Sequence, residues 1–248
     1  ASDAPETTVA VQYTCYAGDH SYIELNDIAA AQVGNDYYVD VFNALSEADN
    51  ATVTMLKDAV FTDTCIVTGT VTLDMNGRKI SNTSGIWDQY AGKWSLISVR
   101  GNGDLTITGN GTLSTLKDDI YAVDVYDATS SCTIESGTFI GNIHAVYVRG
   151  GKLTVNGGHF SVQQKYSQEQ PDEFVLNCYD ANYKVGTARI TVTGGTFEKF
   201  NPADCAAEGE GTNFVSNGYT VTSEKNGEDT WYTVVPLTAE NSAAVVNG

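Results

Sequence analysis

The sequence predicts an all-β fold, a right-handed parallel β-helix in which successive coils of the chain stack as a solenoid. Three observations predict it. A short phrase that alternates apolar residues with Thr and then turns at Gly recurs along the chain. A second run of alternating apolar residues precedes each copy. The composition, with 24 Gly and 14 Tyr but only 4 Pro and 2 Met, favours strands and tight turns over helices.

The recurring phrase predicts one strand of each coil. Its period is two, so we expect strands that end in a turn requiring a positive φ. The aligned glycines recur at intervals close to the roughly 20–30 residues of one solenoid coil. The longest interval contains a polar insertion at 163–173, which we expect to leave the coil as a loop. The copies span 105–113, 132–139, 153–160 and 190–197, with a weaker forerunner at 71–77 and aligned glycines at Gly111, Gly137, Gly158 and Gly195.

The runs that precede the copies predict a second strand in each coil. Stacked coils bury the apolar side of every repeat against its neighbours. The expected inward columns are Ile97/Val99, Val123/Val125, Val146/Val148 and Leu176/Cys178. On the outside, Arg100, Tyr126, Arg149 and Tyr179 alternate cation and aromatic ring. Neighbouring coils lie about 4.8 Å apart, so we predict a structural ladder of stacked guanidinium groups and rings.

The two flanks predict caps. Residues 37–48 place Phe42 and Leu45 after an N-cap residue at Asp40, which indicates a short N-terminal capping helix. Residues 218–235 predict a C-terminal β-hairpin that turns at Asn-Gly. We therefore divide the chain into an N-terminal extension or attachment segment (1–36), a capped β-helix (37–235) and a C-terminal tail (236–248).

The composition of the chain limits the classes of molecule that we expect it to bind. The chain has 248 residues, with 13 Lys and Arg against 31 Asp and Glu, a formal charge of −18. Such a field repels phosphate backbones, so we expect no nucleic acid partner. No run of 18 apolar residues occurs, so we expect no membrane insertion. The first residues, 1–5, suit a terminus left by signal peptide cleavage, and we expect an extracellular or cell-surface location, or a virion surface.

Two groups of residues are candidates for binding. The segment 84–94 carries Trp87, Tyr90 and Trp94 on a loop between coils, where aromatic rings can stack on sugars or anchor a protein partner. We favour the alternative that this loop folds over the strands and buries its rings. Asp118 and Asp119 are candidate ligands for a loose structural calcium, although we favour solvated turn acids. No other cofactor is expected.

An enzyme active site is not apparent. A glycoside hydrolase needs two carboxyl groups that flank one bond, yet Asp124 aligns with Ser98 and Tyr147 in the neighbouring coils. His20, His144 and His159 have no nucleophile at a recognisable spacing. The sequence therefore predicts a protein that is not an enzyme.

The five cysteines predict no zinc site. They contain no CxxC pair and no His at ligand spacing. Their odd number leaves at least one unpaired. Cys15 with Cys65, or Cys178 with Cys205, are the candidate disulfides of an oxidising compartment, and the spacing does not choose between pairings.

Residues 38–80 contain, in order, a predicted strand, a helix with the sequence Phe-Asn-Ala-Leu, and the segments Thr-Val-Thr-Met-Leu-Lys-Asp and Val-Thr-Leu-Asp-Met-Asn-Gly. The Gly-Gly-Thr-Phe copies follow this segment. Together they resemble the surface-exposed parallel β-helix proteins common in gut and rumen Gram-positive bacteria, which are similar in fold to pectate lyases. The resemblance covers 38–235. It implies the fold and an adhesin-like role, and it implies no particular ligand, since fold does not determine function.

Three hypotheses of function follow. The first is a non-enzymatic structural or adhesive module on a cell surface, with a protein or glycan ligand. The second is a subunit of an assembled fibre, either a phage decoration or spike protein or a surface filament, in which 1–36 or the tail at Val245 and Val246 adds a strand to another copy of the chain. The third is a polysaccharide-binding or polysaccharide-degrading protein.

Overall fold

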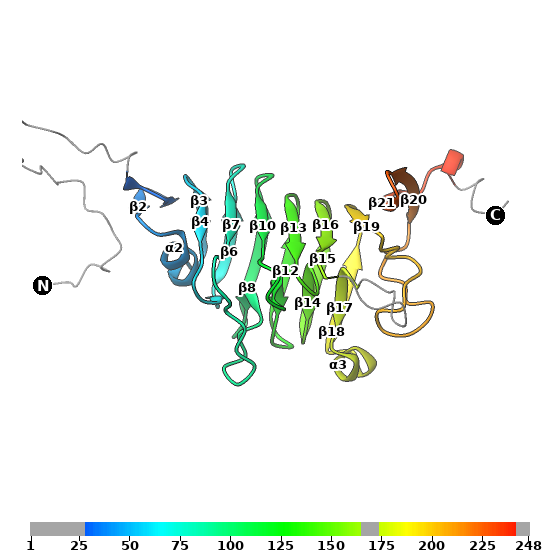
Figure 1. The fold of residues 1–248 in the computed structure, drawn as a ribbon, viewed down its shortest axis with the longest axis horizontal. Helices are drawn as coiled ribbons and strands as arrows, with labels where there is room; N and C mark the ends of the chain where they lie inside the picture. Colours follow the sequence, from blue (N-terminus) through cyan, green and yellow to red (C-terminus); the bar gives the residue numbers. More distant parts are fainter. Residues whose placement is uncertain (1–27, 165–173, 242–248) are drawn as a thin grey trace, which may run out of the picture.

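In a computed structural model, residues 28–164 and 174–241 are described (Figure 1). From β3 to β19 the strands follow one another along the long axis of the molecule in the order of the sequence (Figure 1). Within this range, each strand pairs in parallel with the strands three places before and after it, where these also lie in the range. The chain therefore visits three sheets in turn.

Two of these sheets have eight strands and the third has five. In spatial order, one eight-stranded sheet contains β18 (Ala188–Val192), β15 (Gly151–Val155), β12 (Ser131–Ile134), β9 (Asp104–Thr108), β6 (Thr70–Asp74), β3 (Ala51–Met55), β1 (Ala31–Val33) and β2 (Asp36–Tyr38). The other contains β20 (Tyr219–Asn226), β21 (Asp229–Pro236), β19 (Thr196–Glu198), β16 (His159–Val162), β13 (Thr138–Gly141), β10 (Thr112–Ser114), β7 (Lys79–Ser81) and β4 (Ala59–Val60). The five-stranded sheet contains β17 (Leu176–Cys178), β14 (Val146–Val148), β11 (Tyr121–Val125), β8 (Ser95–Val99) and β5 (Cys65–Val67).

This arrangement corrects the predicted fold class. The sequence predicts one all-parallel β-helix, whereas the described strands form three separate sheets, two of them of mixed direction. Strands β1 and β2 join one sheet in antiparallel pairs, and β21 and β20 do the same in the other. Only the five-stranded sheet is parallel throughout. The prediction fails at the two ends of the chain. The flanking strands there form backbone hydrogen bonds with the sheets and extend them, whereas the prediction treats the flanks as caps on a separate solenoid.

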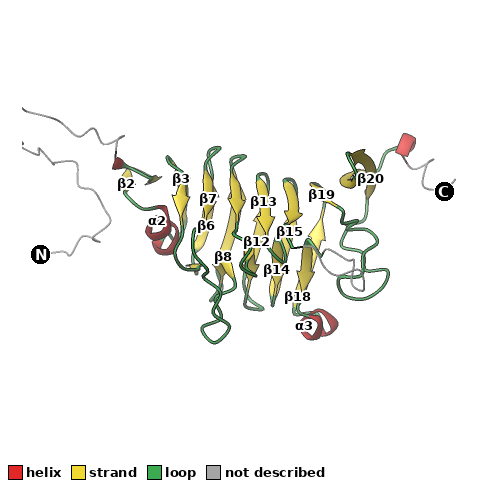
Figure 2. Ribbon diagram, viewed as in Figure 1, coloured by secondary structure: helices red, strands yellow, loops and turns green. Residues whose placement is uncertain are grey.

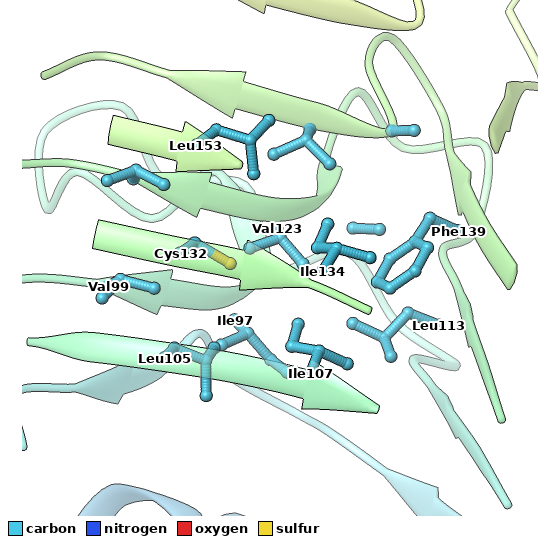
Figure 3. Close-up of a cluster of buried hydrophobic side chains, with 14 of the residues drawn as sticks. Ile97, Val99, Leu105, Ile107, Leu113, Val123, Cys132, Ile134, Phe139 and Leu153 are labelled. Carbon is cyan, nitrogen blue, oxygen red and sulfur yellow. The ribbon is translucent and has the colours of Figure 1, made fainter. Parts of the chain in front are cut away.

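The core lies between the sheets. The inward columns predicted for β8, β11, β14 and β17 are confirmed, because all eight side chains are at most 1% exposed. Figure 3 shows Ile97, Val99 and Val123 facing side chains from the neighbouring sheets. A column of Phe139, Phe160 and Phe197 stacks with ring centroids 5.1 and 5.0 Å apart. These contacts bury the apolar side of each repeat.

The two elements predicted at the flanks are present. Helix α2 (Val41–Glu47) begins after Asp40, whose side chain accepts a hydrogen bond from the Phe42 backbone N–H at 3.0 Å. It buries Val41, Ala44 and Leu45. At the other end, β20 and β21 form the predicted hairpin through Asn226. Figure 2 shows α2 at the N-terminal end and a second helix, α3 (Asp180–Val185), beside β18.

The turn glycines act in two ways. Gly137, Gly158 and Gly195 adopt the positive φ that the repeat predicts. In the earliest full copy the prediction is wrong for Gly111, because Asn110 takes the positive φ of 54° in that turn. Gly111 is needed for space instead, since a Cβ there would lie 2.3 Å from the Arg78 carbonyl oxygen. The predicted insertion loop at 163–173 lies almost wholly outside the described residues.

Candidate functional site

The outer side of the five-stranded sheet carries a group of polar and aromatic side chains in mutual contact. We call this surface the polar face and define it by Ser98, Asp124, Tyr126, Tyr147, Arg149 and Asn177, together with Arg100, which follows β8 directly. The predicted alignment is confirmed, because Asp124 pairs in register with Ser98 and with Tyr147. Every residue of β8 and β11 is buried, so both sides of these central strands are covered. The cover over the polar face comes from loops.

Asp124 is the most enclosed polar residue of this face, with no exposed surface. Its carboxyl group accepts hydrogen bonds from Ser95 Oγ at 2.5 Å and Ser98 Oγ at 3.0 Å. Burial raises the pKa of Asp124 to about 6, although the bond from Ser95 and the charge of Arg100 act in the opposite direction. The carboxyl group of Asp124 therefore has no contact with solvent in this structure.

A cation and aromatic stack lies beside Asp124. The guanidinium carbons of Arg100 and Arg149 each lie 4.3 Å from the centroid of the Tyr126 ring. The Trp94 ring lies 5.4 Å from Tyr126, and Arg149 is also 5.8 Å from the Trp94 ring. The structure thus brings together three of the four residues of the predicted ladder. Tyr179 stands apart, 48% exposed at the end of the sheet.

The loop at 84–94 folds across the polar face and leaves its tip in solvent. Trp94 stacks on Trp87 at 6.4 Å, and Trp87 meets the edge of Tyr121 at 6.1 Å. Trp94 is half-buried, Trp87 is 40% exposed and Tyr90 is 97% exposed. The expectation that the loop buries its rings is therefore wrong for Tyr90 and holds only in part for the tryptophans.

Polar contacts anchor this loop to the sheet. Lys93 Nζ bonds Asp63 Oδ2 at 2.6 Å, and Lys93 and Asp88 exchange backbone hydrogen bonds of 2.8 and 2.9 Å. The Arg100 guanidinium donates to the Gly92 carbonyl oxygen. A Cβ at Gly92 would lie 3.2 Å from the Tyr126 hydroxyl, so the loop backbone lies close to that ring. These contacts hold the loop in one position while its tip is exposed.

A second aromatic group lies at the other end of β11 and β14. The His144 ring stacks on Tyr147 at 5.7 Å and lies 5.2 Å from Tyr121. Its Nδ1 is 2.6 Å from the Phe174 carbonyl oxygen, and Asn177 Nδ2 is 3.2 Å from its Nε2. Burial lowers the pKa of His144 to about 4. The ring is therefore neutral near pH 7, donating through Nδ1 and accepting through Nε2.

The loop that carries Glu208 covers the β17 end of the face. Glu208 Oε1 accepts a hydrogen bond from the Cys178 backbone N–H at 2.6 Å. Burial raises the pKa of Glu208, and burial together with the Glu208 charge raises the pKa of Tyr147. Sequence reasoning did not find Glu208, because it lies outside the repeat and nothing in its local sequence indicates that it contacts the five-stranded sheet. It also missed Ser95, the first residue of β8, because the predicted run begins one residue later.

Of the two candidate calcium ligands, Asp118 is engaged through one carboxyl oxygen and Asp119 through its backbone N–H. Asp118 Oδ2 accepts a hydrogen bond from Asn82 Nδ2 at 2.8 Å, and burial raises the pKa of Asp118. Asp119 lies in a turn with φ of 66°, and its backbone N–H donates to Asn142 Oδ1. Within 28–164 and 174–241, no three His, Cys, Asp or Glu side chains gather closely enough to hold a metal ion.

The other candidate residues of the sequence are separate from the polar face or lie beyond the described residues. Cys65 and Cys178 are buried, and the candidate disulfide between Cys178 and Cys205 is not formed. Burial raises the pKa of both thiols. His159 lies in β16, in register with Thr138 and Thr196 of another sheet. Cys15 and His20 lie outside the described residues.

Comparison with known proteins found no protein similar to this chain. Neither protein-family models, nor curated proteins, nor solved structures gave a match to this chain. The resemblance to bacterial surface proteins therefore stays a prediction. Among the described residues, no helix has the length and the apolar character that a transmembrane span requires.

Proposed function

We propose that the chain is a non-enzymatic adhesive module that acts outside the cell, with the loop at 84–94 as its contact with a surface ligand. The three sheets serve as a stiff support, and the polar face positions the loop. The ligand is a glycan or a protein on another surface.

The exposure of the anchored loop carries this proposal. Tyr90 is 97% exposed and Trp87 is 40% exposed. Aromatic side chains of this kind offer a large contact area with few rotatable bonds, which is typical of binding hot spots. The contacts of Lys93 with Asp63 and of Arg100 with Gly92 order the loop before any ligand arrives. A pre-ordered loop loses less conformational entropy on binding.

The surroundings of Asp124 support a function without catalysis. A general acid or base must reach the proton that it transfers. Asp124 has no exposed surface, and both of its oxygens already accept hydrogen bonds from serine hydroxyls. His144 is likewise buried, with both ring nitrogens engaged. These groups support the fold of the polar face.

The test is binding to a panel of immobilised polysaccharides and mucin, measured by biolayer interferometry. We expect the unmodified chain to bind at least one surface. Replacing Trp87 and Tyr90 together by Ala should weaken that binding at least tenfold. Tyr37→Ala, a half-buried aromatic in β2 at the N-terminal end, is the control and should leave binding unchanged. Equal binding by the double variant and the unmodified chain would contradict the proposal.

The same samples separate the other hypotheses. Release of reducing or unsaturated sugar ends, lost in Asp124→Asn, would establish the polysaccharide-degrading alternative. Assembly into filaments without binding to any surface would favour the fibre alternative.

A further inference from the structure

The two arginines of the polar face differ in their partners. Arg100 donates through Nε to Ser98 Oγ at 2.7 Å and through Nη2 to the Gly92 carbonyl oxygen. The guanidinium of Arg149 has no hydrogen bond or ion pair to any residue that the structure describes; its contacts are the faces of Tyr126 and Trp94. Arg149 therefore presents a fork of N–H donors that the protein does not use.

The side chain of Arg149 is restrained by neighbouring rings and is still accessible to a ligand from solvent. Its side chain is half-buried, so solvent contacts part of it. The ring of Tyr126 at 4.3 Å and that of Trp94 at 5.8 Å restrict the guanidinium plane. An arginine stacked in this way loses little freedom when it pairs with a planar or tetrahedral anion. Beside it, Trp94 Nε1 is a buried donor that finds no acceptor among the described residues.

Direct contact with Arg149 favours an anion although the whole chain is acidic. The charges of Arg100 and Arg149 act on Asp124, while those of Glu208 and Asp180 act on Tyr147 of the same face. The local attraction for an anion is therefore that of the two guanidinium groups and not of the whole face. The formal charge of the chain is −18, which repels an anionic ligand at long range. At physiological ionic strength that repulsion is screened beyond about 8 Å, whereas direct contact with Arg149 is not.

We propose that Arg149, with Trp94 and Tyr126 beside it, binds the carboxylate or sulfate group of an acidic saccharide. This inference rests on the proposed function, because the same ligand would extend to Trp87 and Tyr90 in the loop. Arginine pairs bidentately with carboxylate and with oxyanions of the sulfate type. The adjoining rings of Tyr126 and Trp94 offer flat apolar surface to a sugar ring.

An acidic peptide fits this surface less well. Peptides that bind sheets usually add a strand to a free edge. Strands β8, β11 and β14 are paired on both sides, so none of them offers a free edge beneath Arg149. A ligand at the polar face therefore meets side chains and no free backbone edge, which suits a saccharide.

The test is isothermal titration calorimetry of the full chain at about 0.15 M salt, the physiological ionic strength, and neutral pH with four probes of similar length. These are a uronic acid oligosaccharide, a sulfated oligosaccharide, a neutral oligosaccharide and a poly-glutamate peptide. We expect one or both acidic saccharides to bind at least tenfold more tightly than the neutral one. Arg149→Gln should remove that preference, and Arg149→Lys should retain only part of it, because lysine lacks the bidentate fork.

Arg78→Gln is the control for net charge, because Arg78 is exposed in a turn that precedes β7 in another sheet. It should leave the preference unchanged. The inference is overturned if acidic and neutral saccharides bind equally, if no saccharide binds, if the peptide binds more tightly than the saccharides, or if Arg149→Gln keeps the preference. Circular dichroism and the unfolding midpoint of each variant show whether a loss reflects misfolding.

The failure of this inference differs from that of the proposed function. If Trp87→Ala with Tyr90→Ala weakens binding while Arg149→Gln has no effect, the loop binds its ligand and the anion site does not exist. If Arg149→Gln removes the acidic preference while the loop variant binds normally, the anion site stands and the proposed role of the loop is wrong.

Discussion

Asp124 and His144 both lie buried on the five-stranded sheet, and burial shifts their pKa values with opposite consequences for stability. Burial raises the pKa of Asp124 to about 6, so the stability it contributes is complete below its unfolded pKa, about 4, and is lost as pH rises through 6. Burial lowers the pKa of His144 to about 4, so its contribution is complete above about 6.5 and is lost as pH falls toward 4. The two effects partly cancel between about pH 4 and 6.5.

Replacing Asp124 by Asn should expose this cancellation. The free energy of unfolding of the unmodified chain minus that of Asp124→Asn should be larger at pH 4 than at pH 7, by about 2–3 kcal/mol. Urea unfolding of both proteins at pH 4, 5.5 and 7 measures the difference. Asp88→Asn, in the exposed part of the loop, is the control. A pH-independent difference would mean that Asp124 has an ordinary pKa.

Individual glycines allow strands of neighbouring repeats to pack closely against one another. Gly158 has φ of 106°, and a Cβ there would lie 3.0 Å from the Gly137 carbonyl oxygen and 3.2 Å from the Phe160 ring. Gly158→Ala should lower the free energy of unfolding by about 1–3 kcal/mol. Gly85→Ala should change it by less than about 0.5 kcal/mol, since no atom lies within 4 Å of that Cβ. Equal unfolding midpoints in urea would contradict this assignment.

At the scale of elements, the stacked phenylalanines of β13, β16 and β19 form the apolar side of their sheet. Phe160 lies between Phe139 and Phe197 and is 1% exposed. Phe160→Ala should cost about 3–5 kcal/mol of unfolding free energy, and Phe160→Leu less, because leucine fills part of the cavity. Tyr90→Ala, at an exposed aromatic, should cost almost nothing. Similar losses for Phe160→Ala and Tyr90→Ala in urea would show that the column does not carry the stability of these strands.

Helix α2 depends on its first residue for a defined start. The Asp40 side chain satisfies the Phe42 backbone N–H, and the helix then places Leu45 in the core. Asp40→Ala should lower the free energy of unfolding by about 1 kcal/mol, and Asp40→Asn by much less, because asparagine is also a good N-cap. Chemical denaturation compares the two. If Asp40→Asn lowers the free energy of unfolding as much as Asp40→Ala does, the effect comes from the negative charge of Asp40 and not from its hydrogen bond.

At the scale of the whole molecule, the ends of the sheets are covered by elements of the chain. Helix α2 packs at one end, and β1, β2, β20 and β21 extend two of the sheets in antiparallel pairs. The outer edge of β20 ends in the charged and polar residues Glu224 and Lys225, which oppose pairing with another edge. We therefore expect a monomer at all concentrations by light scattering with size-exclusion chromatography. A mass that grows with concentration would favour the fibre hypothesis.

Local pattern by itself determined the strand that precedes each copy of the repeat, its inward column and its alignment with the equivalent strands of neighbouring copies. It did so because alternation with a period of two identifies the buried side of a strand, and the copies align without any knowledge of distant contacts. It did not divide each copy into the two strands, such as β9 and β10, that lie in different sheets. The register that places Asp124 between Ser98 and Tyr147 was predicted in this way. The start of α2 was predicted as well, because capping depends on neighbouring residues.

Only the tertiary structure decided the rest. Three features depend on segments far apart in the sequence. They are the direction in which β1 and β21 join the sheets, the burial of Asp124, and the position of the Arg149 guanidinium against its two rings. Helix α3 was not predicted, because its six residues bury no side chain and carry no apolar period. The alternation of apolar and polar residues indicates which side of a strand is buried. It does not indicate which distant loop covers that side.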